Sequence, residues 1–150
     1  METEEDTVGD WRPEITVFCC RYCGGVAVEM AGLHRLQYPA GVKVLSVPCT
    51  GAVAPLHLLK SLEQGADGVL VVACPEGNCH HLNGNLRAAK HAAATAALLH
   101  EAGLRKERVR LVNLGIGQGQ AFSDIVREME ARLTELGPAR PGSVRPDPGA

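Results

Sequence analysis

Short apolar segments alternate with helical stretches along this 150-residue chain, and this alternation constrains the fold more than any other feature. The apolar segments are rich in β-branched side chains, which is typical of strands. Each is followed by a longer stretch with apolar residues at helical spacing. The predicted strands are Ile15–Phe18, Val42–Val47, Val69–Ala73 and Val109–Leu114, and the predicted helices cover residues 26–37, 53–62, 86–99 and 122–136.

This order of elements predicts the α/β class, because strands that alternate with helices usually form a parallel sheet. We expect a single doubly wound (flavodoxin-like) four-stranded parallel sheet with helices on both faces. The sequence GVLVVA at Gly68–Ala73 is apolar throughout, as expected of a central strand. The sequence VRLVNL at Val109–Leu114 alternates more and suits an edge. Gly65, Gly103 and Gly137 follow the last three predicted helices and are expected to end them.

The composition excludes several classes of protein. With a net charge of −2 and only one Trp, two Tyr and two Phe, the chain has neither a basic surface nor a stacking platform for nucleic acid. The acidic start does not resemble a secretory signal, and no apolar run is long enough for a membrane span. We therefore expect a cytoplasmic protein with one domain over residues 15–137. Residues 1–14 are predicted to be an acidic disordered leader and residues 138–150 a Pro-rich disordered tail.

All six cysteines lie between positions 19 and 79, and five of them are predicted to meet at one edge of the sheet. The carboxyl ends of parallel strands share the edge at which such folds bind ligands, and three separate turns deliver thiols there. In a reducing cytoplasm this indicates a metal, cluster or redox site rather than a disulfide framework. Cys19 faces opposite to Cys20 and is predicted to pack in the core. The five converging residues are Cys20, Cys23, Cys49, Cys74 and Cys79.

Other motifs give weaker signals. His80 and His81 directly follow Cys79 and could join a metal site, because zinc accepts mixed cysteine and histidine ligands. The loop Gly115–Gly119 is rich in glycine but lacks the lysine and hydroxyl pair of a phosphate-binding loop. A nucleotide site there is therefore weakly supported. His34 and His57 are predicted to be ordinary surface residues.

The third predicted helix carries a basic face. Arg87, Lys90 and His91 are spaced at i, i+3 and i+4, which places them on the same side of the helix. A solvated surface is the favoured interpretation, since exposed charges usually serve solubility. Docking to an acidic partner is the alternative.

The cysteine pattern and its flanking sequence resemble a known family. They are similar to the iron–sulfur delta subunit of the F420-non-reducing (methyl-viologen-reducing) hydrogenase, the FlpD-type domain associated with heterodisulfide reductase. The resemblance spans about residues 15–137, nearly the whole of the predicted domain. The chain departs from the family's usual residues at Ala52, Pro75 and Asn78, which surround the cysteines. The matching stretches are Cys20–Cys23, Leu36–Pro39, Cys49–Gly51, Gly65–Val72, Cys74–His80 and Gly84–Asn85.

This resemblance implies a [2Fe–2S] cluster and a role in electron transfer. It implies two partners, of which one is a hydrogenase or dehydrogenase subunit. The other is a flavoprotein subunit like that of heterodisulfide reductase. Four thiolates hold such a cluster, so five cysteines leave one spare. On spacing, Cys20, Cys23 and Cys49 have the best claim, and Cys74 and Cys79 compete for the fourth position.

Two other functions remain open at this point. One is a zinc-binding structural or assembly module, with Cys20, Cys23, Cys49 and one of Cys74, Cys79 or His80 as ligands. The other is an enzyme that acts by thiol–disulfide exchange, with Cys20–Cys23 or Cys74–Cys79 as the reactive pair. As part of an electron-transfer complex, the chain is not expected to have an independent substrate site, and whether to class it as an enzyme stays open.

Overall fold

The computed structural model describes residues 12–21, 41–75, 83–115 and 118–139, and these form a parallel α/β sheet with its helices. All strand pairs are parallel, and the strand order is β2-β1-β3-β4. This confirms the α/β fold class predicted from the alternating pattern. In chain order the elements are β1 (Ile15–Cys20), β2 (Val42–Val47), the 3-10 helix η3 (Thr50–Ala52), α2 (Pro55–Glu63), β3 (Gly68–Ala73), α3 (Gly84–Glu101), the 3-10 helix η4 (Lys106–Arg108), β4 (Val109–Asn113) and α4 (Gly119–Leu136).

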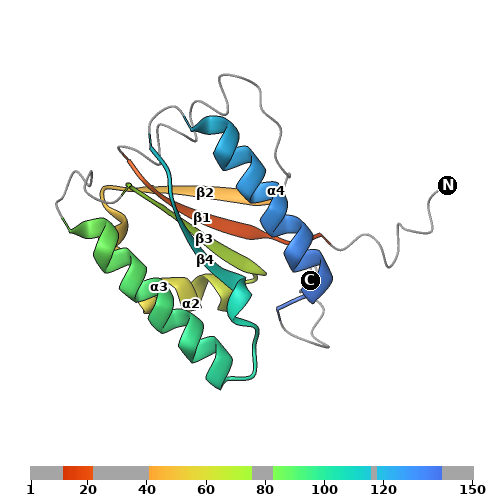
Figure 1. The fold of residues 1–150 in the computed structure, drawn as a ribbon. Coiled ribbons are helices and arrows are strands. Elements are labelled where there is room, and N and C mark those ends of the chain that lie inside the picture. Colours follow the sequence, from red (N-terminus) through yellow and green to blue (C-terminus); the bar gives the residue numbers. More distant parts are fainter. Residues whose placement is uncertain (1–11, 22–40, 76–82, 116–117, 140–150) are drawn as a thin grey trace.

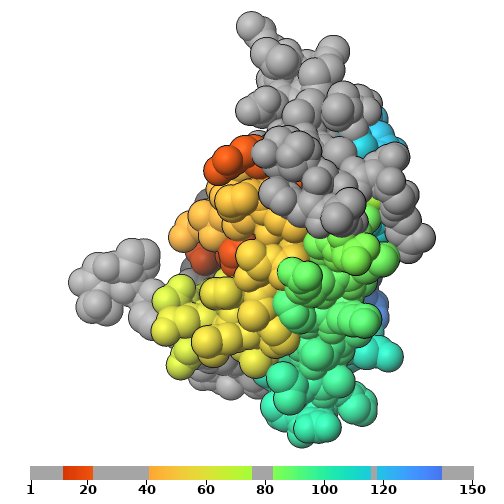
Figure 2. Space-filling model, turned by 90° about the vertical axis from the view of Figure 1, so that its left-hand side faces the viewer, coloured from red at the N-terminus to blue at the C-terminus, as the bar shows by residue number. Residues whose placement is uncertain are grey.

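Helices cover both faces of the sheet (Figure 1). On one face α4 packs against the sheet through Phe122, Val126 and Leu133, which are fully buried. On the other face α2 and α3 form a second apolar cluster, and they lie side by side in Figure 2. No helix within the described parts of the chain is long and apolar enough to cross a lipid bilayer. The predicted helix over residues 26–37 lies outside the described residues.

The positions of the central strand β3 and the edge strand β4 agree with those predicted from the sequence. Every residue of β3 is buried, because this strand has a neighbour on each side and a helix layer on each face. Strand β4 lies at one edge and is only partly buried. Gly65, Gly103 and Gly137 have φ values of 121°, 85° and 84°. These left-handed conformations favour glycine, and they occur at the three predicted helix ends.

Strand β1 is two residues longer than the sequence pattern indicates. It continues through Cys19 and Cys20, whose register partners are Val72 on β3 and Val47 on β2. The two cysteines are therefore held by strand pairing rather than by a turn. Because successive side chains of a strand point to opposite faces, Cys19 and Cys20 are directed to different sides of the sheet.

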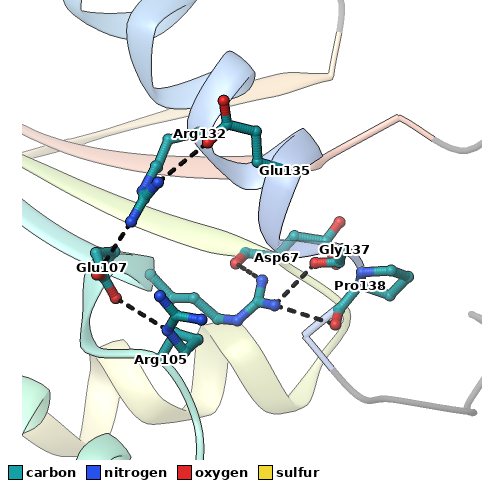
Figure 3. Close-up of polar contacts among 8 residues, drawn as sticks. Asp67, Arg105, Glu107, Arg132, Glu135, Gly137 and Pro138 are labelled. Carbon is teal, nitrogen blue, oxygen red and sulfur yellow. Dashed lines mark hydrogen bonds and ion pairs between the residues drawn. The ribbon is translucent and has the colours of Figure 1, made fainter.

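A buried polar network lies at the amino end of the sheet, and Figure 3 shows its contacts around Asp67, Gly137 and Pro138. This end is opposite the cysteine edge, because all the strands are parallel. The Arg108 guanidinium donates to the backbone carbonyls of Asp67 (3.0 Å), Gly137 (2.8 Å) and Pro138 (3.1 Å). Burial lowers the pKa of Arg108, and the nearby Asp67 charge opposes that shift. The Asp67 carboxylate accepts the backbone N–H of Glu14 at 2.9 Å and of Ala139 at 3.1 Å. The network thus fastens both ends of the described chain to the sheet.

Candidate functional site

Two thiols meet at the carboxyl edge of the sheet. Cys20 is the last residue of β1, and Cys74 directly follows β3. Their Sγ atoms are 3.4 Å apart, and both residues are about 1% exposed. The two strands end at the same level, because Cys19 pairs with Val72 and Cys20 is therefore level with Ala73. Cys74 is the next residue after Ala73, and its thiol reaches that of Cys20 from just beyond the end of β3. The parallel topology thus brings into contact two thiols that are 54 positions apart in the sequence.

The separation of these sulfurs suits one metal centre. A disulfide bond is about 2.05 Å long, so 3.4 Å is a non-bonded contact. Two thiolates at about 2.3 Å from a tetrahedral metal are roughly 3.8 Å apart. Cys20 and Cys74 would need to move by only a few tenths of an ångström to ligate the same ion. The donor set is therefore suitable for a thiolate-bound metal or cluster.

Cys49 approaches the same edge from the end of β2. It caps the N-terminus of η3, and its Sγ accepts the backbone N–H of Gly51 at 3.4 Å. Such a hydrogen bond favours the thiolate form of a cysteine. Cys49 is partly buried, and Thr50 behind it is 1% exposed. The turn thus presents the thiol of a partly buried cysteine and is itself well packed.

Gly51 allows this turn to pack directly on the start of α3. A Cβ at position 51 would lie 2.8 Å from both the Cα and the carbonyl oxygen of Gly84. Backbone atoms cannot move aside as flexible side chains do, so the Cys49 turn itself must shift. We expect Gly51→Ala to lower the free energy of unfolding by about 1–3 kcal/mol, as overpacking does. Urea denaturation measures this, and the exposed neighbour variant Ala52→Ser should change stability by less than about 0.5 kcal/mol. Equal stability of both variants would contradict the close packing.

Two asparagines hold the Cys74 backbone, and sequence reasoning assigned neither of them a role. The Asn85 side chain donates from Nδ2 to the carbonyls of Cys74 (3.1 Å) and Pro75 (2.8 Å). Asn113 at the end of β4 donates to the same Cys74 carbonyl at 2.6 Å. The only sequence signal was the Gly84–Asn85 pair, and its burial depends on contacts that no local pattern reveals.

The other predicted site residues divide into two groups. Cys23, Cys79, His34, His80 and His81 lie outside the described residues. Among the residues that are described, no three His, Cys, Asp or Glu side chains form a group that could hold a metal ion. The predicted five-thiol site therefore remains a prediction, of which the structure describes three members.

Cys19 points to the other face of the sheet from Cys20, as predicted from the sequence. It is 2% exposed and belongs to the apolar cluster under α4, together with Val17, Val72 and Phe122. Its surroundings are those of a core side chain.

Two histidines of the described helices, His57 and His91, have structural contacts. His91, which the sequence groups with Arg87 and Lys90, is only partly exposed, and its Nδ1 lies 2.9 Å from the Val53 carbonyl. Arg87 and Lys90 are exposed, so the predicted basic face consists of these two residues. His57 is exposed, and its Nδ1 accepts the backbone N–H of Ala54 at the start of α2.

The glycine-rich segment near α4 is only partly described. The side-chain oxygen of Gln118 accepts the backbone N–H of Gly115, and Gly119 is the first residue of α4. The Gln118 side chain therefore bridges the turn locally. These contacts account for part of the loop's sequence without a bound phosphate.

Fold and site together define a class: a doubly wound parallel α/β protein with thiols at the ligand-binding edge of its sheet. Comparison with known proteins narrows this class. Residues 15–137 match the family described as methyl-viologen-reducing hydrogenase, delta subunit (FlpD). The chain belongs to this family, and the resemblance inferred from the cysteine motifs is confirmed.

Individual relatives cover most of the chain. The F420-non-reducing hydrogenase iron-sulfur subunit of Archaeoglobus profundus is 40% identical over 129 residues, which is 86% of this chain and 94% of the relative. The F420-non-reducing hydrogenase vhu iron-sulfur subunit of Methanopyrus kandleri is 38% identical over 124 residues, 83% of this chain and 94% of the relative. A third match is to one subunit of the ferredoxin/F(420)H(2)-dependent CoB-CoM heterodisulfide reductase of Methanosarcina acetivorans. It is 33% identical over 126 residues, 84% of this chain but 16% of that longer protein.

Proposed function

We propose that this protein is an electron-transfer subunit that binds a [2Fe–2S] cluster at the carboxyl edge of its sheet. It would pass electrons between a hydrogenase or dehydrogenase module and a flavoprotein subunit like that of heterodisulfide reductase. The observation that carries the proposal is the contact between Cys20 Sγ and Cys74 Sγ at 3.4 Å, in a position where the two could share one metal ion. The names of the relatives, which are iron-sulfur subunits of hydrogenases and a heterodisulfide reductase subunit, support the same role.

Four ligands would come from the five cysteines predicted to converge. The contact with Cys20 favours Cys74 over Cys79 as a ligand, and Cys49 would supply a third sulfur already turned toward a backbone N–H. When bound, the cluster would accept and release one electron at a time. The chain's own contribution is to exclude water around the buried Cys20 and Cys74. Burial and N–H···S hydrogen bonds both tune the reduction potential of such a centre.

Metal analysis of the protein purified without oxygen tests the proposal. We expect a brown protein with about two iron atoms and two inorganic sulfides per chain. Stoichiometric zinc in a colourless protein, after expression with iron supplied, would instead support the structural zinc module. A metal-free protein with rapid thiol–disulfide turnover would support the redox enzyme. Either of these two results would exclude the cluster. The predicted cytoplasmic location is part of the same proposal, since thiol ligands require a reducing compartment.

The partner flavoprotein would dock beside the start of α3. Arg87 and Lys90 are exposed on the first turns of this helix, and Leu86 beside them is 47% exposed. In Figure 2 this part of α3 adjoins the segment that carries Cys49, and Gly51 packs directly against Gly84. Two positive charges next to the thiol edge would attract an acidic surface of a redox partner.

Charge reversal tests this docking surface. We expect Arg87→Glu combined with Lys90→Glu to weaken binding of the flavoprotein subunit roughly tenfold at low salt, mainly through slower association, and less at high salt. Surface plasmon resonance at two salt concentrations measures the effect. Arg105→Glu with Lys106→Glu makes the same change in charge beyond the far end of α3 and serves as the matched control. An equal loss of binding in both double variants would show an effect of net charge and would contradict the proposed docking surface.

A further inference from the structure

The buried side chain of Asn85 is held in one orientation. Asn85 is the second residue of α3 and is 3% exposed. Its Nδ2 donates to two carbonyl oxygens, those of Cys74 and Pro75. Turning the amide over would bring Oδ1 against both of these acceptors, so the observed orientation is the favourable one. Within the described structure Oδ1 itself is buried and has no hydrogen-bond partner.

An unpartnered acceptor makes asparagine a costly choice at this position. A leucine would fill a similar volume without burying an unpaired oxygen. What only the amide provides is the pair of N–H groups that meet the Cys74–Pro75 backbone. The need to hold this backbone therefore accounts for a polar side chain here.

Cys74 depends on such contacts because it lies beyond the strand ladder. Strand β3 ends at Ala73, whose carbonyl still accepts the backbone N–H of Leu114 at 3.0 Å. The next carbonyl, that of Cys74, is instead bound by Asn85 from α3 and by Asn113 from β4. Two amides from different elements thus fix one peptide plane, and that plane belongs to the residue whose Sγ lies 3.4 Å from Cys20 Sγ.

We infer that Asn85 is a positioning residue that holds Cys74 so that its sulfur meets that of Cys20 as a two-thiol metal site formed before any metal arrives. The inference deepens the proposed function and rests on it only for the identity of the metal. Asn113 assists from β4 through its bond to the same carbonyl.

The preformed thiol pair can be tested in metal-free protein. The full chain, stripped of metal by a chelator, is treated with diamide, and the rate of Cys20–Cys74 disulfide formation is followed by peptide mapping. The two thiols lose two electrons and two protons, and diamide takes these up as its hydrazine. We expect Asn85→Ala to slow this step by at least about tenfold, because a displacement of reacting atoms by about 1 Å has effects of this size or larger.

Two variants separate hydrogen bonding from packing. Asn85→Asp keeps the shape of the side chain but removes the N–H donors, so it should slow disulfide formation as much as Asn85→Ala does. Thr95→Val alters an equally buried residue of α3 whose hydroxyl donates to the His91 carbonyl of its own helix, so it should leave the rate unchanged. A fast Asn85→Asp variant, or slowing by Thr95→Val equal to that by Asn85→Ala, would overturn the inference.

The outcome is independent of the cluster. If Asn85→Ala does not give a folded circular dichroism spectrum, Asn113→Ala at the exposed edge takes its place. An unchanged rate of disulfide formation in that variant would contradict the inference that the amides of Asn85 and Asn113 position Cys74. If the wild-type protein binds no iron but the rate still depends on Asn85, the proposed function fails and the inference stands. If iron binds and the rate does not depend on Asn85, the proposed function stands and the inference about Asn85 fails.

Discussion

Serine in place of Cys20 or Cys74 is expected to abolish or strongly alter the electron paramagnetic resonance signal of the reduced protein and to reduce its iron content to near zero. Both sulfurs are buried and in contact, so each serine variant removes one of the two thiols that would share a metal ion. A serine hydroxyl stays protonated at neutral pH and is a much poorer ligand for iron than a thiolate. Iron analysis and the spectrum of each variant measure the effect.

Cys19→Ser is the matched control, because it makes the same change one residue earlier in the same strand. Cys19 packs among Val17, Val72 and Phe122 under α4, so its variant should retain the iron and the signal. A hydroxyl placed in this apolar cluster should lower stability by about 1–3 kcal/mol. Loss of the signal in Cys19→Ser but not in Cys20→Ser would mean that the facing of β1 is reversed.

Arg108→Met is expected to cause the largest loss of stability, about 3–5 kcal/mol, which is typical when one member of a buried charged network is removed. The variant leaves the carbonyls of Gly137 and Pro138 without their donor and the buried Asp67 carboxylate without its nearby positive charge. Methionine keeps much of the aliphatic volume of arginine, so the loss of stability measures the contribution of the guanidinium group. Urea denaturation followed by circular dichroism measures it.

Arg110→Met provides the comparison two residues further along. Arg110 is paired with Glu128 at 3.0 Å, but their side chains are 39% and 67% exposed. Removing such a surface ion pair should cost less than about 1 kcal/mol. If Arg108→Met loses no more stability than Arg110→Met, the amino-end network does not hold the ends of the described chain in solution.

The fold was predictable from the sequence because its signals are local. β-branched runs, helical spacing and glycines at Gly65, Gly103 and Gly137 act within a few residues of one another. The end of β1 was not predictable to the residue, since Cys19 and Cys20 are held in the strand by Val47 and Val72 from other parts of the chain.

The site was predictable only in outline. Parallel topology places strand ends together, which is why Cys20 and Cys74 were expected at one edge. The roles of Asn85 and Arg108 were hidden, because each looks like an ordinary surface residue until distant segments bury it. Arg108 in particular is the last of four consecutive charged residues, Arg105–Arg108, yet it is 3% exposed.

The separation of the Arg108 network from the cysteine edge has a consequence for the order in which this protein matures. The two apolar clusters and the Arg108 network at the amino end contain none of the proposed ligands among the described residues. Folding therefore does not have to wait for a metal, unlike that of small domains built around one. A metal or cluster would then enter a folded scaffold in which the buried thiols of Cys20 and Cys74 already lie in contact. A chain that loses this group could be reloaded rather than degraded.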